Sequence, residues 1–171
     1  MTPGVSVSDP ADPKAARQAA LHLLARRDFS SGELRSKLEE RGFDRTVVAE
    51  LVEALQRERL VNDARYVEHF VSYHAGRGQG PIRIARELRS LKVDAELIDR
   101  FLAEGQDWAV RAREVRQKKF GRPLPENYAE KAKQARFLQY RGFTGSQIRA
   151  ALGTDIDLDA HFDDKDLDDK A

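Results

Sequence analysis

The stretch that decides the fold is residues 34–52, which read LRSKLEERGFDRTVVAELV. Leu34 and Leu38 lie one helical turn apart, and apolar residues return at helical spacing from residue 48 onward. Between the two patterns stands the sequence Gly-Phe-Asp at 42–44. Glycine commonly ends a helix in the left-handed conformation, and aspartate commonly caps the start of the next one. The stretch therefore predicts a helix, a tight turn and a second helix.

The same register occurs twice more, at an offset of 50 residues. Residues 84–102 read IARELRSLKVDAELIDRFL, and residues 138–152 read LQYRGFTGSQIRAAL. Lys92 stands where the other two copies have glycine. We expect Lys92 either to adopt the left-handed conformation at some cost or to end its helix differently. A fixed period of this kind indicates tandem structural repeats.

A further helix is expected before each of these pairs, over residues 15–27, 63–75 and 107–120. In the second of these helices, Tyr66, Phe70 and Tyr73 follow helical spacing, and Trp108 opens the third. Aromatic residues at this spacing are typical of a core-facing stripe, so we expect all four to be buried.

The expected fold class is all-α, with three tandem three-helix repeats at 14–62, 63–106 and 107–153. Each unit is close to the lower size limit for a self-sufficient core, so the repeats should stack into an elongated, curved array. The flanking segments 1–13 and 154–171 are expected to be disordered tails. The second tail carries eight aspartates and few apolar residues.

The formal net charge of +1 conceals an uneven distribution. Residues 15–153 contain 27 Lys and Arg against 19 Asp and Glu, a net charge of +8. Residues 154–171 contain 2 Lys against 8 Asp, a net charge of −6. A basic body indicates a polyanionic partner or an acidic protein surface. The alternative is a highly charged, soluble helical surface without a dedicated ligand.

Composition also limits location and chemistry. The chain has no cysteine, and no apolar run approaches the roughly 20 residues that span a bilayer. Residues 1–13 lack the basic and apolar regions of a signal peptide. We therefore expect a cytoplasmic protein that does not enter a membrane.

No catalytic pattern is recognisable, and we expect neither an enzyme, nor a metal site, nor a cofactor. His69 and His74 are five residues apart, so they do not share a helix face as a metal pair would. The glycine-rich segment 76–80 resembles a phosphate loop, but it follows a helix and lacks the Gly-Lys-Ser/Thr ending. We interpret it as a connector.

Two basic clusters are the candidate binding surface. In the helix expected at 81–91, arginines lie opposite the apolar face, and a second cluster lies within 111–122. Arginine suits forked pairing with phosphate or carboxylate groups. The alternative for each cluster alone is a solvated helix face. The candidate contact residues are Arg77, Arg83, Arg86, Arg89, Arg113, Arg116, Lys118, Lys119 and Arg122.

Several segments of the chain, taken in order, resemble one protein family. They are LLARRDFSSGEL at 23–34 with Gly42-Phe43, LVNDARY at 60–66 with Phe70-Val71, GQGPIRI at 78–84 with Glu87-Leu88, and Phe120-Gly121 followed by Phe137-Leu138 and Arg141-Gly142-Phe143. Over about residues 15–153 the chain resembles the RecX family. Lys92 departs from the resemblance, because many members have glycine there.

The resemblance implies a function and partners. RecX proteins bind the RecA recombinase and its filament on single-stranded DNA, lie along the filament groove, and dampen recombinase and ATPase activity without catalytic residues. The expected partners are therefore RecA and the RecA–single-stranded DNA filament, with weak direct DNA binding. We expect a monomer. The alternative is a general DNA-binding module, since helix-turn-helix proteins also use three-helix units.

Overall fold

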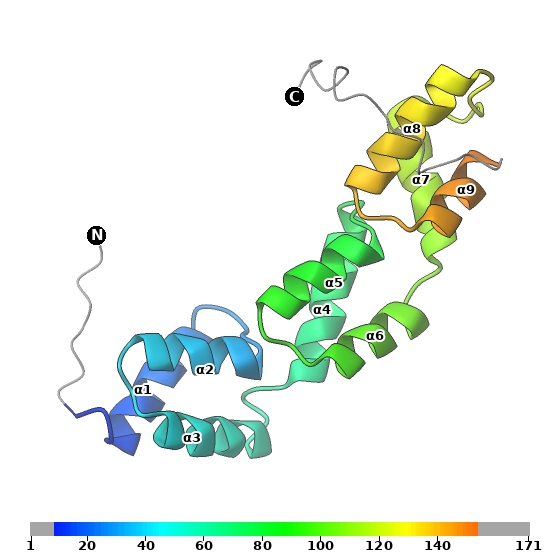
Figure 1. Ribbon diagram of the computed structural model, residues 1–171. Coiled ribbons are helices and arrows are strands. Elements are labelled where there is room, and N and C mark those ends of the chain that lie inside the picture. The colour runs from blue at the N-terminus through cyan, green and yellow to red at the C-terminus, as the bar shows by residue number, and fades with distance from the viewer. Residues whose placement is uncertain (1–8, 154–171) are drawn as a thin grey trace.

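The computed structural model describes residues 9–153, so the predicted acidic tail at 154–171 and residues 1–8 lie outside the described part. Within that part the chain forms nine α-helices and no strand (Figure 1). The helices are α1 (Pro13–Leu24), α2 (Ser31–Glu40), α3 (Arg45–Arg57), α4 (Asp63–Gly76), α5 (Pro81–Ser90), α6 (Ala95–Glu104), α7 (Trp108–Phe120), α8 (Tyr128–Tyr140) and α9 (Gly145–Leu152).

The helices group by threes into repeat 1 (α1–α3), repeat 2 (α4–α6) and repeat 3 (α7–α9). The main helix pairings lie within a repeat, such as α2 with α3, α4 with α6 and α7 with α9. The repeats follow one another in an elongated, curved array, in which α2, α5 and α8 lie along the inner side of the bend (Figure 1). This confirms the predicted all-α fold of three tandem three-helix units.

The three turns between the second and third helices share one backbone geometry. Their left-handed residues are Gly42 (φ 96°), Lys92 (φ 59°) and Gly142 (φ 90°). The next residue in each turn donates its backbone N–H to a carbonyl five residues back, as in a Schellman motif. The accepting residues are Leu38, Leu88 and Leu138, whose side chains are all fully buried. Of the two alternatives expected for Lys92, the structure shows the left-handed conformation.

The described structure begins before the predicted end of the N-terminal tail. Asp12 caps α1 by accepting a hydrogen bond from the Lys14 N–H at 2.8 Å, and α1 starts at Pro13. The Pro10 carbonyl accepts from the Asp44 N–H at 2.9 Å, which ties this segment to the α2–α3 turn. The prediction of a disordered tail is therefore wrong for residues 9–13, because these capping contacts order them.

The buried apolar side chains form two clusters in the described residues. One extends from Ala16 to Val61 and is the core of repeat 1. The other extends from Val67 to Leu152 and runs without interruption through repeats 2 and 3. Repeat 1 thus has a core of its own, whereas repeats 2 and 3 share one.

Three of the four aromatic residues expected in the core pack there, and one does not. Tyr66 and Phe70 pack against the shared core, and Trp108 is buried with its Nε1 donating to the Leu102 carbonyl at 2.7 Å. Tyr73 is 59% exposed, so its predicted burial is wrong. It lies in the last turn of α4, where its hydroxyl accepts a hydrogen bond from Arg77 Nη1 at 2.8 Å.

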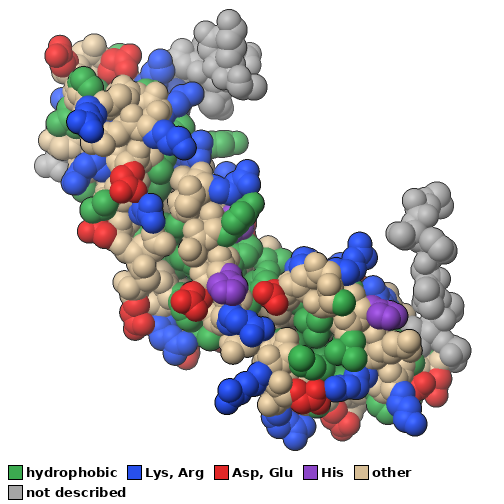
Figure 2. Space-filling view, turned by 180° about the vertical axis from the view of Figure 1, so that it is seen from behind, with side chains coloured by type: hydrophobic (Ala, Val, Ile, Leu, Met, Phe, Trp, Pro, Cys, Tyr) green, Lys and Arg blue, Asp and Glu red, His purple; other side chains and the backbone are tan. Residues whose placement is uncertain are grey.

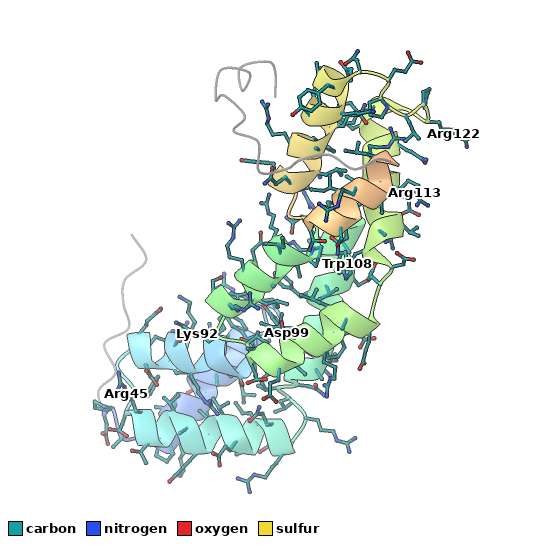
Figure 3. All side chains as sticks on the ribbon, turned by 45° about the vertical axis from the view of Figure 1, so that its right-hand side comes forward. Arg45, Lys92, Asp99, Trp108, Arg113 and Arg122 are labelled. Carbon is teal, nitrogen blue, oxygen red and sulfur yellow. The ribbon has the colours of Figure 1, made fainter. Side chains whose placement is uncertain are left out.

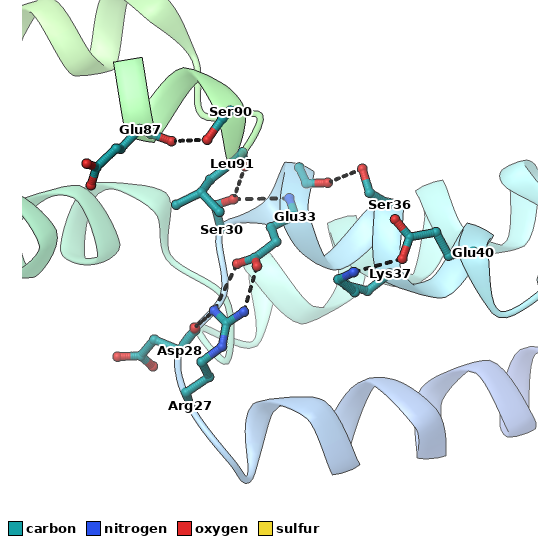
Figure 4. Close-up of polar contacts among 11 residues, drawn as sticks. Arg27, Asp28, Ser30, Glu33, Ser36, Lys37, Glu40, Glu87, Ser90 and Leu91 are labelled. Atoms are coloured by element: carbon teal, nitrogen blue, oxygen red, sulfur yellow. Dashed lines mark hydrogen bonds and ion pairs between the residues drawn. The ribbon is translucent and has the colours of Figure 1, made fainter. Parts of the chain in front are cut away.

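Successive repeats meet at joints, which we define as the contacts around the start of a repeat's second helix with the next repeat, chiefly with the turn between that repeat's second and third helices. At joint 1, Ser30 Oγ donates to the Leu91 carbonyl at 2.7 Å and accepts from the Glu33 N–H at 3.0 Å (Figure 4). Arg27 donates twice to the Glu33 carboxylate, at 2.9 and 2.6 Å, and this bonding raises the pKa of Arg27. Ser31 donates through N and Oγ to the Asp63 carboxylate, both at 2.6 Å.

Joint 2 has the equivalent place between repeats 2 and 3. The Gly80 N–H donates to the Arg141 carbonyl at 2.8 Å, and the Ile82 N–H donates to the Gly142 carbonyl at 3.0 Å. Gly80 and Arg141 lie 50 residues beyond Ser30 and Leu91, the pair that forms joint 1. The repeat in sequence is therefore also a repeat in how the units connect.

Candidate functional site

A groove of about 420 Å³ lies beside joint 2, and we call it the basic groove. It is bounded by the end of α4 and the loop that follows it, by one face of α7, and by the last turn of α8. Its lining residues are Ala75, Gly76, Arg77, Gly78, Arg111, Glu114, Val115, Lys118, Lys119, Phe137 and Arg141. Both repeat 2 and repeat 3 are needed to form it.

The charge of the basic groove is strongly positive. Five of its lining residues are cations and one is a carboxylate. The carboxylate, Glu114, accepts from Arg111 Nη1 at 3.1 Å. Within residues 9–153, no carboxylate forms an ion pair with the other four cations, which are Arg77, Lys118, Lys119 and Arg141. Clustered cations without carboxylate partners favour an anionic ligand.

Two of the three arginines of the basic groove, Arg77 and Arg141, are fixed by neutral acceptors. Arg77 donates to the Tyr73 hydroxyl, and its guanidinium lies 5.5 Å from the centre of the Tyr73 ring. Arg141 Nη1 donates to the Arg77 carbonyl at 3.0 Å, and its guanidinium lies 5.1 Å from the centre of the Phe137 ring. These contacts hold both cations in place without neutralising them.

The glycine-rich segment 76–80 serves packing. A Cβ on Gly78, whose φ is 80°, would lie 3.1 Å from Arg141 Nη1 and 3.2 Å from Val115 Cγ2. A Cβ on Gly80 would lie 2.4 Å from backbone atoms of Gly142. The glycines thus allow the loop to approach repeat 3 closely, and this approach supports the connector interpretation.

Helix α7 positions its groove residues by its period. Arg111, Val115 and Lys118 follow one another at intervals of four and three residues, so they share one helix face. Arg113, on α7, and Arg122, in the loop after α7, are both exposed on the outer side of the array (Figure 3). The second predicted cluster is therefore divided between two faces of the array.

Arg116 is buried, and the prediction that it contacts a partner is wrong. Its side chain has no exposed surface. Its guanidinium donates to the carbonyls of Arg122 at 3.0 Å and Pro123 at 2.9 Å, and to Gln134 Oε1 at 3.2 Å. Arg116 thereby supplies hydrogen-bond donors to two carbonyls of the loop that joins α7 to α8.

The arginines predicted on α5 lie apart from the basic groove. Arg83 is half-buried at joint 2, and its Nε donates to Glu87 Oε1 at 3.0 Å. Arg89 is exposed and lies 3.4 Å from Asp99 Oδ1. Arg86 is exposed, and no ion pair involves it in the described part of the chain. Of the nine predicted contact residues, the structure brings Arg77, Lys118 and Lys119 together.

Two cations of the basic groove were missing from the predicted contact residues. Arg111 belonged to the predicted basic cluster at 111–122 but was not named as a contact, although its spacing to Lys118 places both on one face of α7. Arg141 has no local signal, since it lies 64 residues from Arg77. Figure 2 shows Lys and Arg side chains over repeat 3 and its border with repeat 2, and others over repeat 1, on one face of the molecule.

Other kinds of site are absent from the described residues. No group of three or more His, Cys, Asp and Glu side chains in residues 9–153 could hold a metal ion. A search of the same residues finds no helix with the length and apolarity needed to traverse a bilayer.

Comparison with known proteins identifies the repeats. Family models for the first, second and third three-helix domains of RecX match residues 16–55, 62–102 and 107–152, in that order. The chain belongs to the RecX family. A regulatory protein RecX of Halorhodospira halophila is 47% identical over 139 residues, which cover 81% of this chain and 86% of that protein. A regulatory protein RecX of Pseudomonas entomophila is 40% identical over 146 residues, covering 84% and 94%.

Solved RecX structures share the fold. The crystal structure of RecX from Lactobacillus salivarius matches with a TM-score of 0.72 at 19% identity, covering 86% of this chain and 97% of that one. A second crystal structure, of a regulatory protein RecX, matches with a TM-score of 0.66 at 22% identity, covering 81% of this chain and 70% of that one. The three-repeat architecture is thus the RecX architecture.

Proposed function

We propose that this RecX-family protein binds RecA and its filament on single-stranded DNA and mainly inhibits recombinase and ATPase activity. The ordered match of all three RecX three-helix domains carries the proposal. The curated relatives named regulatory protein RecX support the regulatory part. The protein acts by binding, as a cytoplasmic monomer without cofactor or catalysis.

The shape of the array supports binding along a filament. Successive small repeats present an extended surface that follows a helical groove through many modest contacts. The second helices α2, α5 and α8 lie on the inner side of the bend (Figure 1). Recognition of filament shape needs no contact with base edges, so no recognition helix is required.

The basic residues supply the electrostatic part of binding. Arg77, Lys118 and Lys119 in the basic groove, together with exposed Arg86 on α5, are the proposed contacts with DNA phosphates or acidic RecA surface. Arg83 and Arg89 contribute less, because each already has a carboxylate nearby. Arg113 on α7 and Arg122 in the loop after it face the outer side of the array (Figure 3).

A paired binding experiment tests this function against a general DNA-binding module. The protein is titrated into RecA filaments formed on a labelled oligonucleotide, and separately into bare duplex of the same length. A RecX-type regulator engages the filament at concentrations that leave the duplex free. Equal or stronger binding to the duplex would instead support the DNA-binding module.

A further inference from the structure

We infer that the acidic segment 154–171 of this chain docks into the basic groove and covers its cations. The segment and the groove are the two halves of one intramolecular contact. This goes beyond the proposed function, because the contact lies within the chain and forms without RecA. It makes the groove a regulated surface, since an anionic partner has to displace the segment first.

Charge complementarity is the first observation that pairs the segment with the groove. Five cations and one carboxylate line the groove, a net charge of +4. Segment 154–171 contains eight Asp and two Lys, a net charge of −6. Within residues 9–153, four of the groove cations form no ion pair, so they are available to carboxylates from outside that range. Arginine and lysine both donate charge-assisted hydrogen bonds to carboxylates.

The groove and the segment also share an apolar component. Val115 and Phe137 line the groove and are only partly buried. The segment reads Asp-Ile-Asp-Leu-Asp at 155–159, so apolar side chains alternate with carboxylates. Such a sequence can place carboxylates on the cations while Ile156 or Leu158 covers the apolar lining. A purely polar anion would leave that lining exposed to water.

The position of Gly153, which caps the end of α9, brings the segment within reach of the groove. A Cβ on Gly153 would lie 3.1 Å from Leu124 Cδ1. Leu124 is five residues beyond the groove residue Lys119, a separation of at most about 18 Å. Asp159 is six residues beyond Gly153 and can span about 20 Å in an extended chain. Because the segment is tethered this near, its effective concentration at the groove is high, and modest contacts suffice.

The experiment compares amide proton–nitrogen correlation spectra of the full chain and of two charge variants, without RecA. Lys118→Ala/Lys119→Ala removes two cations of the groove. Arg113→Ala/Arg122→Ala removes two cations from the outer side of the array (Figure 3). It is a strict control, because Arg122 is two residues from Leu124, beside which the segment starts. Circular dichroism establishes that each variant keeps its helical content.

The readout is the set of amide resonances of residues 156–163, which belong to the segment itself. The lysine variant should shift them several-fold more than the arginine variant does, because it alone removes charges of the groove. Raising the salt concentration to about 1 M, where the Debye length is about 3 Å, should move the wild-type resonances toward those of the lysine variant.

A reciprocal variant reports on the contact from the side of the groove. Asp155→Asn/Asp157→Asn/Asp159→Asn removes three carboxylates of the segment and changes no residue of the described fold. It should shift the amide resonances of Gly78 and Val115, which line the groove. It should leave the resonances of repeat 1 in place, since repeat 1 contributes no residue to the groove.

Two results would overturn the inference. One is that the lysine variant leaves the resonances of residues 156–163 at their wild-type positions. The other is that both charge variants shift them equally, which would mean that the overall positive charge attracts the segment and the groove does not hold it. Neither result removes the proposed function, since RecA inhibition is measured separately.

Discussion

The two joints occupy equivalent positions in the repeat, yet they differ in what crosses them. Joint 1 depends on side chains, with Ser30 and Ser31 donating to Leu91 and Asp63. Joint 2 depends on backbone pairs, from Gly80 to Arg141 and from Ile82 to Gly142. The apolar core continues across joint 2 but stops at joint 1. Repeats 2 and 3 are therefore one cooperative unit, to which repeat 1 is attached.

At each joint a helix and a turn approach so closely that one of the two must carry a glycine, and the joints differ in which one carries it. A Cβ on Gly32 would lie 2.5 Å from the Lys92 Cβ, and a Cβ on Gly142 would lie 2.5 Å from the Arg83 Cβ. At joint 1 the glycine is on the helix and the larger residue on the turn, whereas at joint 2 the two are exchanged. The close approach requires one residue without a side chain, and either side can provide it.

The largest expected effects concern the separate cores. Leu38→Ala, in repeat 1, and Leu138→Ala, in the shared core, should each cost about 2–5 kcal/mol of unfolding free energy, because both side chains are fully buried. Leu38→Ala should speed amide hydrogen exchange in repeat 1 alone. Leu138→Ala should speed amide hydrogen exchange in repeats 2 and 3 together. Identical exchange changes over the whole chain would contradict separate cores.

The second prediction compares two glycines with similar backbone angles. Gly142→Ala should cost about 2–4 kcal/mol, because it adds a clash with Arg83 to left-handed strain. Gly42→Ala should cost only about 1–2 kcal/mol, because no described atom lies within 4 Å of the added Cβ. Urea denaturation measures both values. Equal losses would show that joint 2 is not tightly packed.

A double-mutant cycle tests whether Gly32 and Lys92 compensate each other at joint 1. Gly32→Ala should destabilise the protein by about 1–3 kcal/mol, because the new Cβ would lie 2.3 Å from the Lys92 carbonyl oxygen and 2.5 Å from the Lys92 Cβ. Lys92→Gly alone should be stabilising by about 1 kcal/mol, since it relieves a left-handed lysine.

When Gly32→Ala is already present, Lys92→Gly should stabilise the protein by more than it does in the wild type. The reason is that it removes the Lys92 Cβ, one of the two atoms that clash with the added Cβ. Additive effects in urea denaturation would mean that Gly32 and Lys92 do not compensate each other.

The smallest expected effect concerns the arginines of α5, between the joints. Arg86→Glu/Arg89→Glu should weaken RecA-filament binding by about three- to tenfold while leaving the fold intact, because both side chains are exposed. Arg83 is left unchanged, since it packs into joint 2. Unchanged filament binding by this variant would mean that these arginines form a solvated helix face and contact no partner.

Local features of the fold were predictable, because they depend on residues close in sequence. The turns at 42–44, 92–94 and 142–144 follow from glycine, apolar and capping signals within a few positions. At Lys92 the sequence left two alternatives open, a left-handed residue or a different helix end, and the structure shows the first. The stacking of repeats follows from the small size of each unit.

The site was only partly predictable, because contacts between repeats leave no local pattern. The periodicity of α7 indicates its faces, but it does not show that one face meets the loop after α4 or that Arg116 is enclosed by the α7–α8 loop. Likewise, Gly32 and Lys92 are 60 positions apart, so their compensation is visible only in the structure.

The most direct test of the account is DNA-dependent ATP hydrolysis by RecA with this protein titrated in, using RecA from the same organism. The account predicts that ATP turnover falls between sub-stoichiometric and equal ratios of protein to RecA, and that the Arg113→Ala/Arg122→Ala control inhibits as well as the wild type. Unchanged ATP turnover at an equal ratio, with the protein shown to be folded, would contradict regulation of RecA by this chain.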